Sequence, residues 1–174
     1  MNWKELLSGE IEATYATTQN LIRKVNPAEL DWKPATGGNW MTTGQLLKHI
    51  STACGFGCRA LITGDWGLPE GKSYQDLSPA DMFPPAESMP TVRSVPEAEQ
   101  LLAEDKRLAL ETIEQSSESD LADKVLPVPW DPATLLPLGC QILQLVEHLK
   151  SHKAQLFYYL KLQGQPVGTV DLWG

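Results

Sequence analysis

The chain has 174 residues, of which 42% are hydrophobic and 21% charged, and its formal net charge at pH 7 is −8. These values are typical of a globular protein whose core needs no disulfide, and we expect residues 1–174 to form one domain. The acidic charge, without a cluster of Lys and Arg, excludes nucleic acid as an expected partner.

The sequence also argues against export and membrane insertion. The N-terminal stretch MNWKELLSGEIEATY contains acidic residues and lacks the apolar segment of a signal peptide. No apolar run approaches the roughly 18 residues that a membrane span requires. We interpret Cys54, Cys58 and Cys140, which form no C-x-x-C pair, as small buried residues rather than disulfide or thiolate sites. We therefore expect a cytoplasmic protein.

Four segments show the periodicity of amphipathic helices, and nothing indicates a convincing sheet. They cover residues 2–25, 42–63, 95–115 and 138–163. Four helices of this length predict an all-α fold, a four-helix bundle with long irregular connections.

Local signals define several helix ends. Thr42 with Gln45, and Ser94 with Glu97, fit the capping box, in which the two side chains satisfy free backbone N–H groups. Gly64 fits the left-handed position that follows a helix. These signals predict that the second helix runs unbroken to residue 63.

The connections between the helices are unusual. Residues 64–94 are rich in Pro, Gly and Ser and long for a compact domain, so we expect either a functional covering loop or a partly disordered segment. Between the third and fourth helices, the prolines of KVLPVPW at 124–130 favour a short edge strand. The tail GTVDLWG can fold back onto the bundle, and the tryptophans of the loops are expected to pack locally or to line a pocket mouth.

The fourth predicted helix carries a polar stripe. Residues at i and i+4 share a helix face, and this face is formed by Gln141, Gln144, His148, His152, Gln155 and Tyr159. The stripe borders the apolar face, whereas Lys150, Lys153 and Lys161 lie at the far edge of that face and beyond it. The stripe is therefore placed to aim side chains at a cleft between helices.

The histidines are the candidate metal ligands. His148 and His152 are one turn apart, so both imidazoles can reach one ion, although such a pair is also typical of ordinary polar residues at a helix boundary. His49, on a mostly apolar face of the second helix, completes the set of histidines in the chain. Three neutral imidazoles suit Zn, Ni, Fe or Cu and leave positions open for water or substrate. We favour a metal site over a metal-free bundle whose histidines only form hydrogen bonds.

Two stretches carry a resemblance to a known family. They are DWKPATGGNWMTTGQLLKHI, which ends just after His49, and LVEHLKSHKAQLFYYLKLQGQPVG, which contains His148, His152 and Gln155. Over nearly the whole chain, the sequence resembles the DinB-like (DinB/YfiT) metal-binding four-helix bundles. It departs from them at Lys153 and Ala154, where the family often has Arg and Gly.

The resemblance implies a bundle of up-down-down-up topology, frequently homodimeric, with the metal held by His49, His148 and His152. It also implies thiol-dependent chemistry, because the better understood relatives are S-transferases for bacillithiol or glutathione and mycothiol-dependent isomerases. We expect zinc or nickel as the metal, with iron as a third choice.

The expected function is therefore a metal-dependent S-transferase that adds a low-molecular-weight thiol to a small electrophile, since a metal ion lowers the pKa of a thiol. The alternatives are a metal-dependent hydrolase, in which the ion activates water, and a non-enzymatic stress-response module that binds metal. Gln155 and Tyr159 are the candidate residues for contacting the bound cosubstrate, with a solvent-facing Gln and a core-edge Tyr as the alternatives. Glu147 points away from the stripe, and we exclude it as a ligand.

Overall fold

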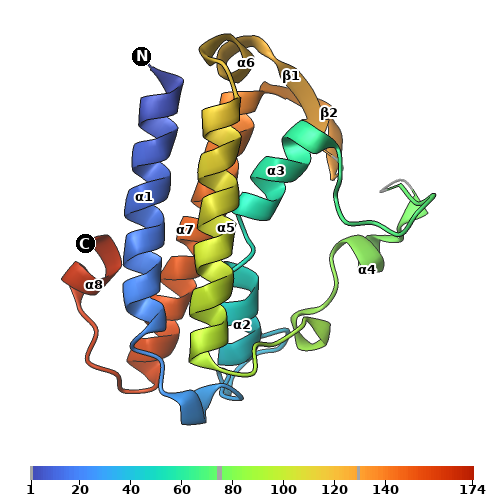
Figure 1. Cartoon of the computed structure of the whole chain (residues 1–174). Helices are drawn as coiled ribbons and strands as arrows, with labels where there is room; N and C mark the ends of the chain where they lie inside the picture. Colours follow the sequence, from blue (N-terminus) through green and yellow to red (C-terminus); the bar gives the residue numbers. More distant parts are fainter. Residues whose placement is uncertain (1, 74–75, 129) are drawn as a thin grey trace.

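The computed structural model describes residues 2–73, 76–128 and 130–174 and shows a helical bundle (Figure 1). Its long elements are α1 (Trp3–Ile22), the successive helices α2 (Thr43–Ile50) and α3 (Gly55–Thr63), α5 (Val95–Gln115) and α7 (Leu138–Leu162). Helices α1 and α7 run in one direction, and α2, α3 and α5 run in the other (Figure 1). The all-α bundle and its up-down-down-up order are therefore confirmed.

Shorter elements lie in the connections between the long helices and in the tail. They are the 3-10 turns η1 (Pro27–Glu29) and η3 (Ala86–Ser88), the helices α4 (Pro79–Met82), α6 (Glu118–Asp123) and α8 (Thr169–Trp173), and the strands β1 (Val125–Val128) and β2 (Asp131–Pro137). The segment between α3 and α5 runs away from the bundle and contains α4 (Figure 1). Its described residues contain little regular structure besides α4 and η3.

The predicted strand in residues 124–130 is confirmed as β1, while Pro129 lies outside the described residues. The expectation of no sheet is wrong, because β1 pairs with β2 in an antiparallel hairpin. Val125 pairs with Pro137 and Leu126 with Leu136, and the register shifts before Val128. A two-stranded hairpin consists of two edge strands, so prolines that exclude a central strand are accommodated in it.

The predicted second helix is also wrong in one respect, because it is broken between Ile50 and Gly55. The break is caused by Asp105 of α5, whose carboxylate accepts hydrogen bonds from the backbone N–H groups of Cys54 (3.2 Å) and Phe56 (2.8 Å). At Gly55 the chain touches α5, since a Cβ there would lie 1.7 Å from the carbonyl oxygen of Asp105. The side chain from α5 therefore caps a new helix, α3.

The same carboxylate is deeply buried. The Tyr15 hydroxyl donates to Asp105 at 2.7 Å. Burial raises the pKa of Asp105, and the hydrogen bonds from Tyr15 and from the start of α3 oppose that rise. Cys54 and Cys58 are buried free thiols beside it, with their Sγ atoms 3.8 Å apart, and Cys140 is a half-buried free thiol.

The other helix caps that the sequence predicted form completely or in part. The capping box of Thr42 and Gln45 is present, with Gln45 N–H donating to Thr42 Oγ1 (3.2 Å) and Thr42 N–H donating to Gln45 Oε1 (2.8 Å). Ser94 accepts from Glu97 N–H at 3.2 Å. Glu97 itself accepts from Arg93 N–H, so the second box is only half formed. Gly64 ends α3 in the left-handed conformation.

One connected core joins the long helices and holds the site in place. Its fully buried members include Ile11 of α1, Leu46 and Ile50 of α2, and Leu149 and Leu156 of α7. Leu46, Ile50 and Leu149 flank the histidines in sequence, so burial of these residues fixes the surfaces that carry the imidazoles. In the part of the chain that the structure describes, every helix is too short or too polar to cross a membrane.

The tail folds back as α8 against α1 and α7. Lys153 is buried there, where its Nζ donates to the Leu172 carbonyl (2.7 Å) and to Thr17 Oγ1 (3.3 Å). The sequence placed Lys153 at the far edge of the apolar face or beyond it, and the return of the tail buries this position. Its aliphatic stem packs between helices while its ammonium group meets the negative end of α8.

Candidate metal centre

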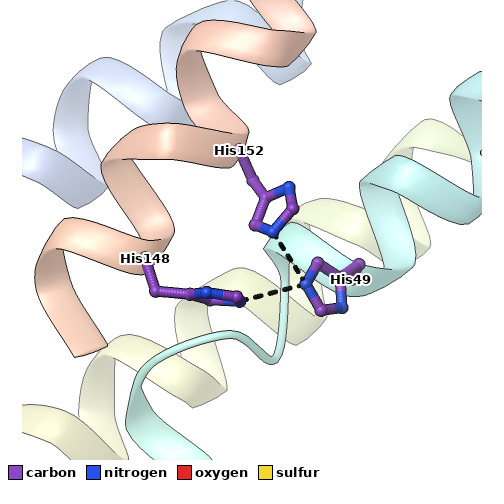
Figure 2. A group of neighbouring side chains, drawn as sticks. All are labelled: His49, His148 and His152. Atoms are coloured by element: carbon purple, nitrogen blue, oxygen red, sulfur yellow. Dashed lines mark hydrogen bonds between the residues drawn. The ribbon is translucent and has the colours of Figure 1, made fainter. Parts of the chain in front are cut away.

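Three imidazoles from two helices converge on one point (Figure 2). His49 lies in the last turn of α2, and His148 and His152 lie one turn apart on α7. His49 Nε2 is 3.1 Å from His148 Nε2 and 3.1 Å from His152 Nε2. The three candidate ligand atoms all lie within 4.8 Å of one another. The structure thus brings together the three histidines that the sequence singled out.

These distances match the needs of a transition metal. Two nitrogens bound tetrahedrally to zinc at about 2.0–2.1 Å would be roughly 3.3 Å apart, close to the 3.1 Å found here. Within the described residues the cluster contains histidines alone, without a carboxylate or a thiol. Three nitrogen donors leave room for further ligands, as in catalytic rather than closed structural zinc sites.

Hydrogen bonds around His152 fix its tautomer. The Tyr159 hydroxyl donates to the Met41 carbonyl (2.9 Å) and so accepts from Gln155 Nε2 (3.4 Å). This arrangement turns Gln155 Oε1 toward His152 Nδ1, 3.0 Å away. The Nδ1–H group of His152 therefore donates to Gln155, and its Nε2 presents a lone pair to the cluster.

Hydrogen bonding alone leaves the cluster unsatisfied. A neutral imidazole nitrogen carries either one hydrogen or one lone pair. If His49 Nε2 carries a hydrogen, it can make a well-aligned bond to only one of the two nitrogens that lie 3.1 Å away. The remaining short N···N contact has no such explanation, whereas one shared cation would satisfy all three lone pairs. The donor set therefore fits a bound metal ion.

The surroundings keep the imidazoles neutral. Burial, with the neighbouring His152 and His148, lowers the pKa of His49 from 6.5 to about 4. Burial also lowers the pKa of His148, helped by His152, and that of His152, where Gln155 opposes the shift. Neutral imidazoles are the metal-binding form, so at pH 7 no proton needs to be displaced before binding.

The neighbouring acids do not take part. Glu147, which the sequence excluded, accepts a hydrogen bond from Lys150 Nζ at 2.8 Å. Lys150 also donates to Glu10 of α1 at 2.7 Å. These ion pairs belong to the outer surface of the α1–α7 pair and leave the cluster to the histidines.

The cluster opens onto a cavity. His49 and His148 line a space of about 440 Å³, and the ring of His148 is exposed. The cavity is bounded by α3, α7, the hairpin and the segment that follows α3, and its lining includes Phe56, Trp66 and Trp130. A volume of this size lies in the range of small-molecule sites. The sequence offered local packing or a pocket mouth as roles for the loop tryptophans, and Trp66 and Trp130 line the cavity.

The polar stripe on α7 divides into two parts. His148, His152, Gln155 and Tyr159 belong to the cluster and its hydrogen-bond network. Gln141 instead turns to the hairpin, where its Nε2 donates to the carbonyls of Leu126 and Leu136. Sequence reasoning placed Gln141 on the right face but assigned it no role, because its partners lie on a hairpin of which only one strand was predicted.

Comparison with known proteins agrees with the fold and identifies the family. A search of curated proteins finds no match. The structure is similar to the crystal structure of a DinB-like protein, YjoA, from Bacillus subtilis, with a TM-score of 0.63 over 93% of this chain and 94% of that chain at 18% sequence identity. That similarity shows the fold. The sequence profile of the DinB superfamily matches residues 10–156, and the chain therefore belongs to the DinB superfamily.

Proposed function

We propose that the protein binds one divalent transition metal ion through the Nε2 atoms of His49, His148 and His152, and that it is a metal-dependent S-transferase. The observation that carries the proposal is the convergence of three neutral imidazole nitrogens. His49 Nε2 lies 3.1 Å from His148 Nε2 and 3.1 Å from His152 Nε2. Zinc and nickel suit this donor set best, followed by iron. When bound, such an ion supplies the Lewis acidity that lowers the pKa of a thiol or a water.

The residues of the chain have distinct parts in this proposal. Gln155 holds His152 in the tautomer that presents Nε2, and Tyr159 orients Gln155. We propose that these two residues serve the bound metal and cosubstrate through His152. Tyr159 is buried and its hydroxyl donates to the Met41 carbonyl, which supports a positioning role.

The cavity favours an enzyme over a structural metal module. A structural zinc site is usually closed by four protein ligands, whereas this cluster has three donors and adjoins a space of about 440 Å³. A hydrolase would need the same centre with water as the nucleophile. Among the fourteen residues that line the cavity, the histidines are the sole titratable groups. A thiol nucleophile needs less help from a separate general base than water does, so we favour the transferase.

Metal analysis of the purified protein is the first test. We expect one transition metal ion per chain, and we expect His49→Ala, His148→Ala and His152→Ala each to lose it. Gln144→Ala is the matched control, because Gln144 is exposed on α7 one turn before His148 and outside the cluster. Retention of the metal in all three histidine variants would show that the site is elsewhere.

The reaction is tested by incubating low-molecular-weight thiols with a panel of electrophiles, with and without a chelator. Chelator-sensitive thioether formation that disappears in His148→Ala supports the transferase. Chelator-sensitive hydrolysis without thiol supports the hydrolase. A metal-loaded protein without turnover over a broad panel supports the non-enzymatic module.

Two further proposals rest on the sequence and on the resemblance to the family. We propose that the protein acts in the cytoplasm and that it forms a homodimer. Light scattering on the eluting protein gives the mass in solution, and twice the chain mass of 19.2 kDa is the expected value. A mass equal to that of one chain at micromolar concentration would contradict the dimer.

A further inference from the structure

The cavity beside the histidines extends along α7. Gln141, Leu145 and His148 lie on one face of this helix, and all three line the cavity. Gln141 and His148 are seven residues apart, which corresponds to about 10 Å along the helix axis. Leu145 lies between them and packs on Gly57 of α3, where an added Cβ would meet its methyl groups at 3.0 Å. The cavity therefore has a histidine end and a remote end, with an apolar floor between them.

The remote end is formed by α3 and the hairpin together with α7. Helix α3 runs antiparallel to α7, so Leu61, one turn beyond Gly57, lies at the level of Gln141 (Figure 1). The hairpin reaches the same place, because Gln141 Nε2 donates to the carbonyls of Leu126 and Leu136. Three separate segments thus enclose the end of the cavity that lies farthest from the histidines.

Apolar groups dominate this remote end. Val128 of β1 and Trp130 of the hairpin turn line the cavity, and the Trp130 ring meets that of Trp66 edge to face, with centroids 5.3 Å apart. Trp130 is 42% exposed. The Gln141 amide offers a ligand no further hydrogen bond, because its Nε2 is paired with two carbonyls and its Oε1 is buried without a partner. Large apolar side chains left partly in water beside a cavity mark a surface for an apolar ligand.

Charge is confined to the histidine end. His49 and His148 are the only titratable groups among the described residues of the lining. The Arg59 guanidinium lies 5.9 Å from the centroid of the Phe56 ring, yet Arg59 itself is not part of that lining. One anionic group at the histidines would be balanced by the proposed metal ion, whereas a charge at the remote end would lose its hydration without gaining an ionic partner. The cavity thus distinguishes the two ends of a ligand.

Of the two reactants in the proposed transfer, the electrophile suits this cavity better. A thiolate is an anion, which the charge of a metal ion can hold. An uncharged electrophile has no such attachment, and its affinity and its position depend on burial of its apolar surface. The apolar floor and the remote end supply that surface.

We propose that this cavity binds the electrophilic substrate, an aromatic compound of about two rings that carries no charge at the end remote from the histidines. The rings lie on Leu145, and the uncharged end lies beside Trp66 and Trp130. The reacting end, with any single polar or anionic group, lies at His49 and His148. The role as electrophile rests on the proposed transferase function, whereas the exclusion of charge from the remote end rests on the lining alone.

Displacement of a fluorescent dye tests this preference with unmodified protein. The dye is N-phenyl-1-naphthylamine, which is neutral and whose fluorescence rises in apolar sites. The competitors are 6-methyl-2-naphthoate and naphthalene-2,6-dicarboxylate, which have similar shapes and differ by one charge at the end opposite the shared carboxylate. In the metal-loaded protein, we expect the monoanion to displace the dye at a concentration lower by about tenfold or more. In chelator-treated protein, we expect neutral 2,6-dimethylnaphthalene to displace the dye and the monoanion to lose about tenfold.

A charge added to the lining tests where the second carboxylate is rejected. Trp130→Lys places an ammonium group at the remote end, and we expect the affinity for the dicarboxylate, relative to the monoanion, to rise by about fivefold. Leu135→Lys is the matched control, because it adds the same charge to the same hairpin at a residue that is 60% exposed and outside the lining. We expect the wild-type ratio of affinities in this variant.

The outcomes separate the cavity from the proposed function. Equal displacement by the two anions in metal-loaded protein would overturn the cavity assignment, and so would the same ratio of affinities in Trp130→Lys and wild type. Metal content is measured on the same samples. A wild type without metal in which 2,6-dimethylnaphthalene displaces the dye would overturn the proposed function and support the apolar cavity. A metal-loaded wild type that binds no dye would overturn the cavity assignment alone.

Discussion

Gln155 Oε1 lies 3.0 Å from His152 Nδ1, on the side of the imidazole opposite the cluster. This contact links a residue three positions later on α7 to the protonation pattern of a candidate ligand. Because Tyr159 and Met41 fix the orientation of the amide, the lone pair of His152 Nε2 is directed at His49 before any metal arrives. Preorganised ligands of this kind bind metal more tightly than free ones.

The first prediction concerns that contact. Gln155→Leu removes the acceptor, so His152 can rotate or adopt the other tautomer, and we expect metal affinity to fall by about 10- to 100-fold. Competition with a chromophoric chelator measures the change. Gln155→Glu keeps an acceptor oxygen facing Nδ1, and we expect it to retain affinity close to wild type. If Gln155→Leu and wild type bind metal with equal affinity, Gln155 does not orient His152 for metal binding.

The second prediction concerns pH. The unfolded chain protonates His49 near its ordinary pKa of 6.5, but the folded chain does so only at about 4. The unfolded state therefore binds more protons between these values, and the free energy of unfolding of the metal-free protein should fall as the pH is lowered through this window. The slope is at most about 1.4 kcal/mol per pH unit for each such histidine.

Urea denaturation of chelator-treated protein between pH 7 and pH 4 measures this slope. His49→Ala should show a shallower dependence than wild type, because it lacks the imidazole whose pKa falls to about 4 on folding. Metal affinity should fall over the same range, since protons compete for the same nitrogens. A pH-independent stability in wild type would contradict the assignment of neutral imidazoles with lowered pKa values.

The third prediction concerns the break between α2 and α3. Gly55→Ala places a methyl group 1.7 Å from the Asp105 carbonyl oxygen, so the two helices must separate. We expect a loss of about 3 kcal/mol in the free energy of unfolding. Because His49 lies in the last turn of α2, we also expect weaker metal binding.

Gly9→Ala is the matched control for this substitution. Gly9 lies within α1, and a Cβ there would meet no atom within 4 Å. Replacing it should stabilise the protein by about 0.5–1 kcal/mol and leave metal affinity unchanged. If Gly55→Ala were as well tolerated as Gly9→Ala in urea denaturation, the close packing of Gly55 on α5 would be refuted.

The fourth prediction concerns the tail. Lys153→Ala removes the ammonium group that binds the Leu172 carbonyl at 2.7 Å, so α8 should detach from α1 and α7 more often. Hydrogen exchange should be faster in the backbone amides of α8 and unchanged in α5. Lys150→Ala is the control, because Lys150 pairs with Glu10 and Glu147 instead. Similar exchange in the two variants would show that Lys153 does not hold the tail.

The features that the sequence predicted are those that depend on neighbours within one helix. The spacing of His148 and His152, the Thr42 cap and the Gly64 stop all follow from helical geometry over four residues or fewer, and the structure has each of them. The bundle follows from the length and amphipathic pattern of the four segments. His49 could be placed with the pair because the bundle brings two core-facing helices together.

The features that the sequence did not predict depend on contacts between distant segments. The break before Gly55 depends on Asp105, about fifty positions away, and no local signal overrides the helical pattern of residues 42–63. Burial of Lys153 depends on the return of the tail. The unpaired Oε1 of Gln141 depends on a hairpin whose second strand lacks alternating polarity. Such contacts are not encoded in helical periodicity.

The central claim is that three imidazoles hold one metal ion, and X-ray absorption at the edge of the metal that copurifies with the protein tests it most directly. We predict three imidazole nitrogens at about 2.0–2.1 Å if the metal is zinc, with the remaining positions filled by solvent oxygen ligands, and no metal bound to purified His49→Ala. A spectrum with sulfur neighbours, or with a shell of oxygen ligands alone that the His49→Ala substitution leaves unchanged, would contradict the claim.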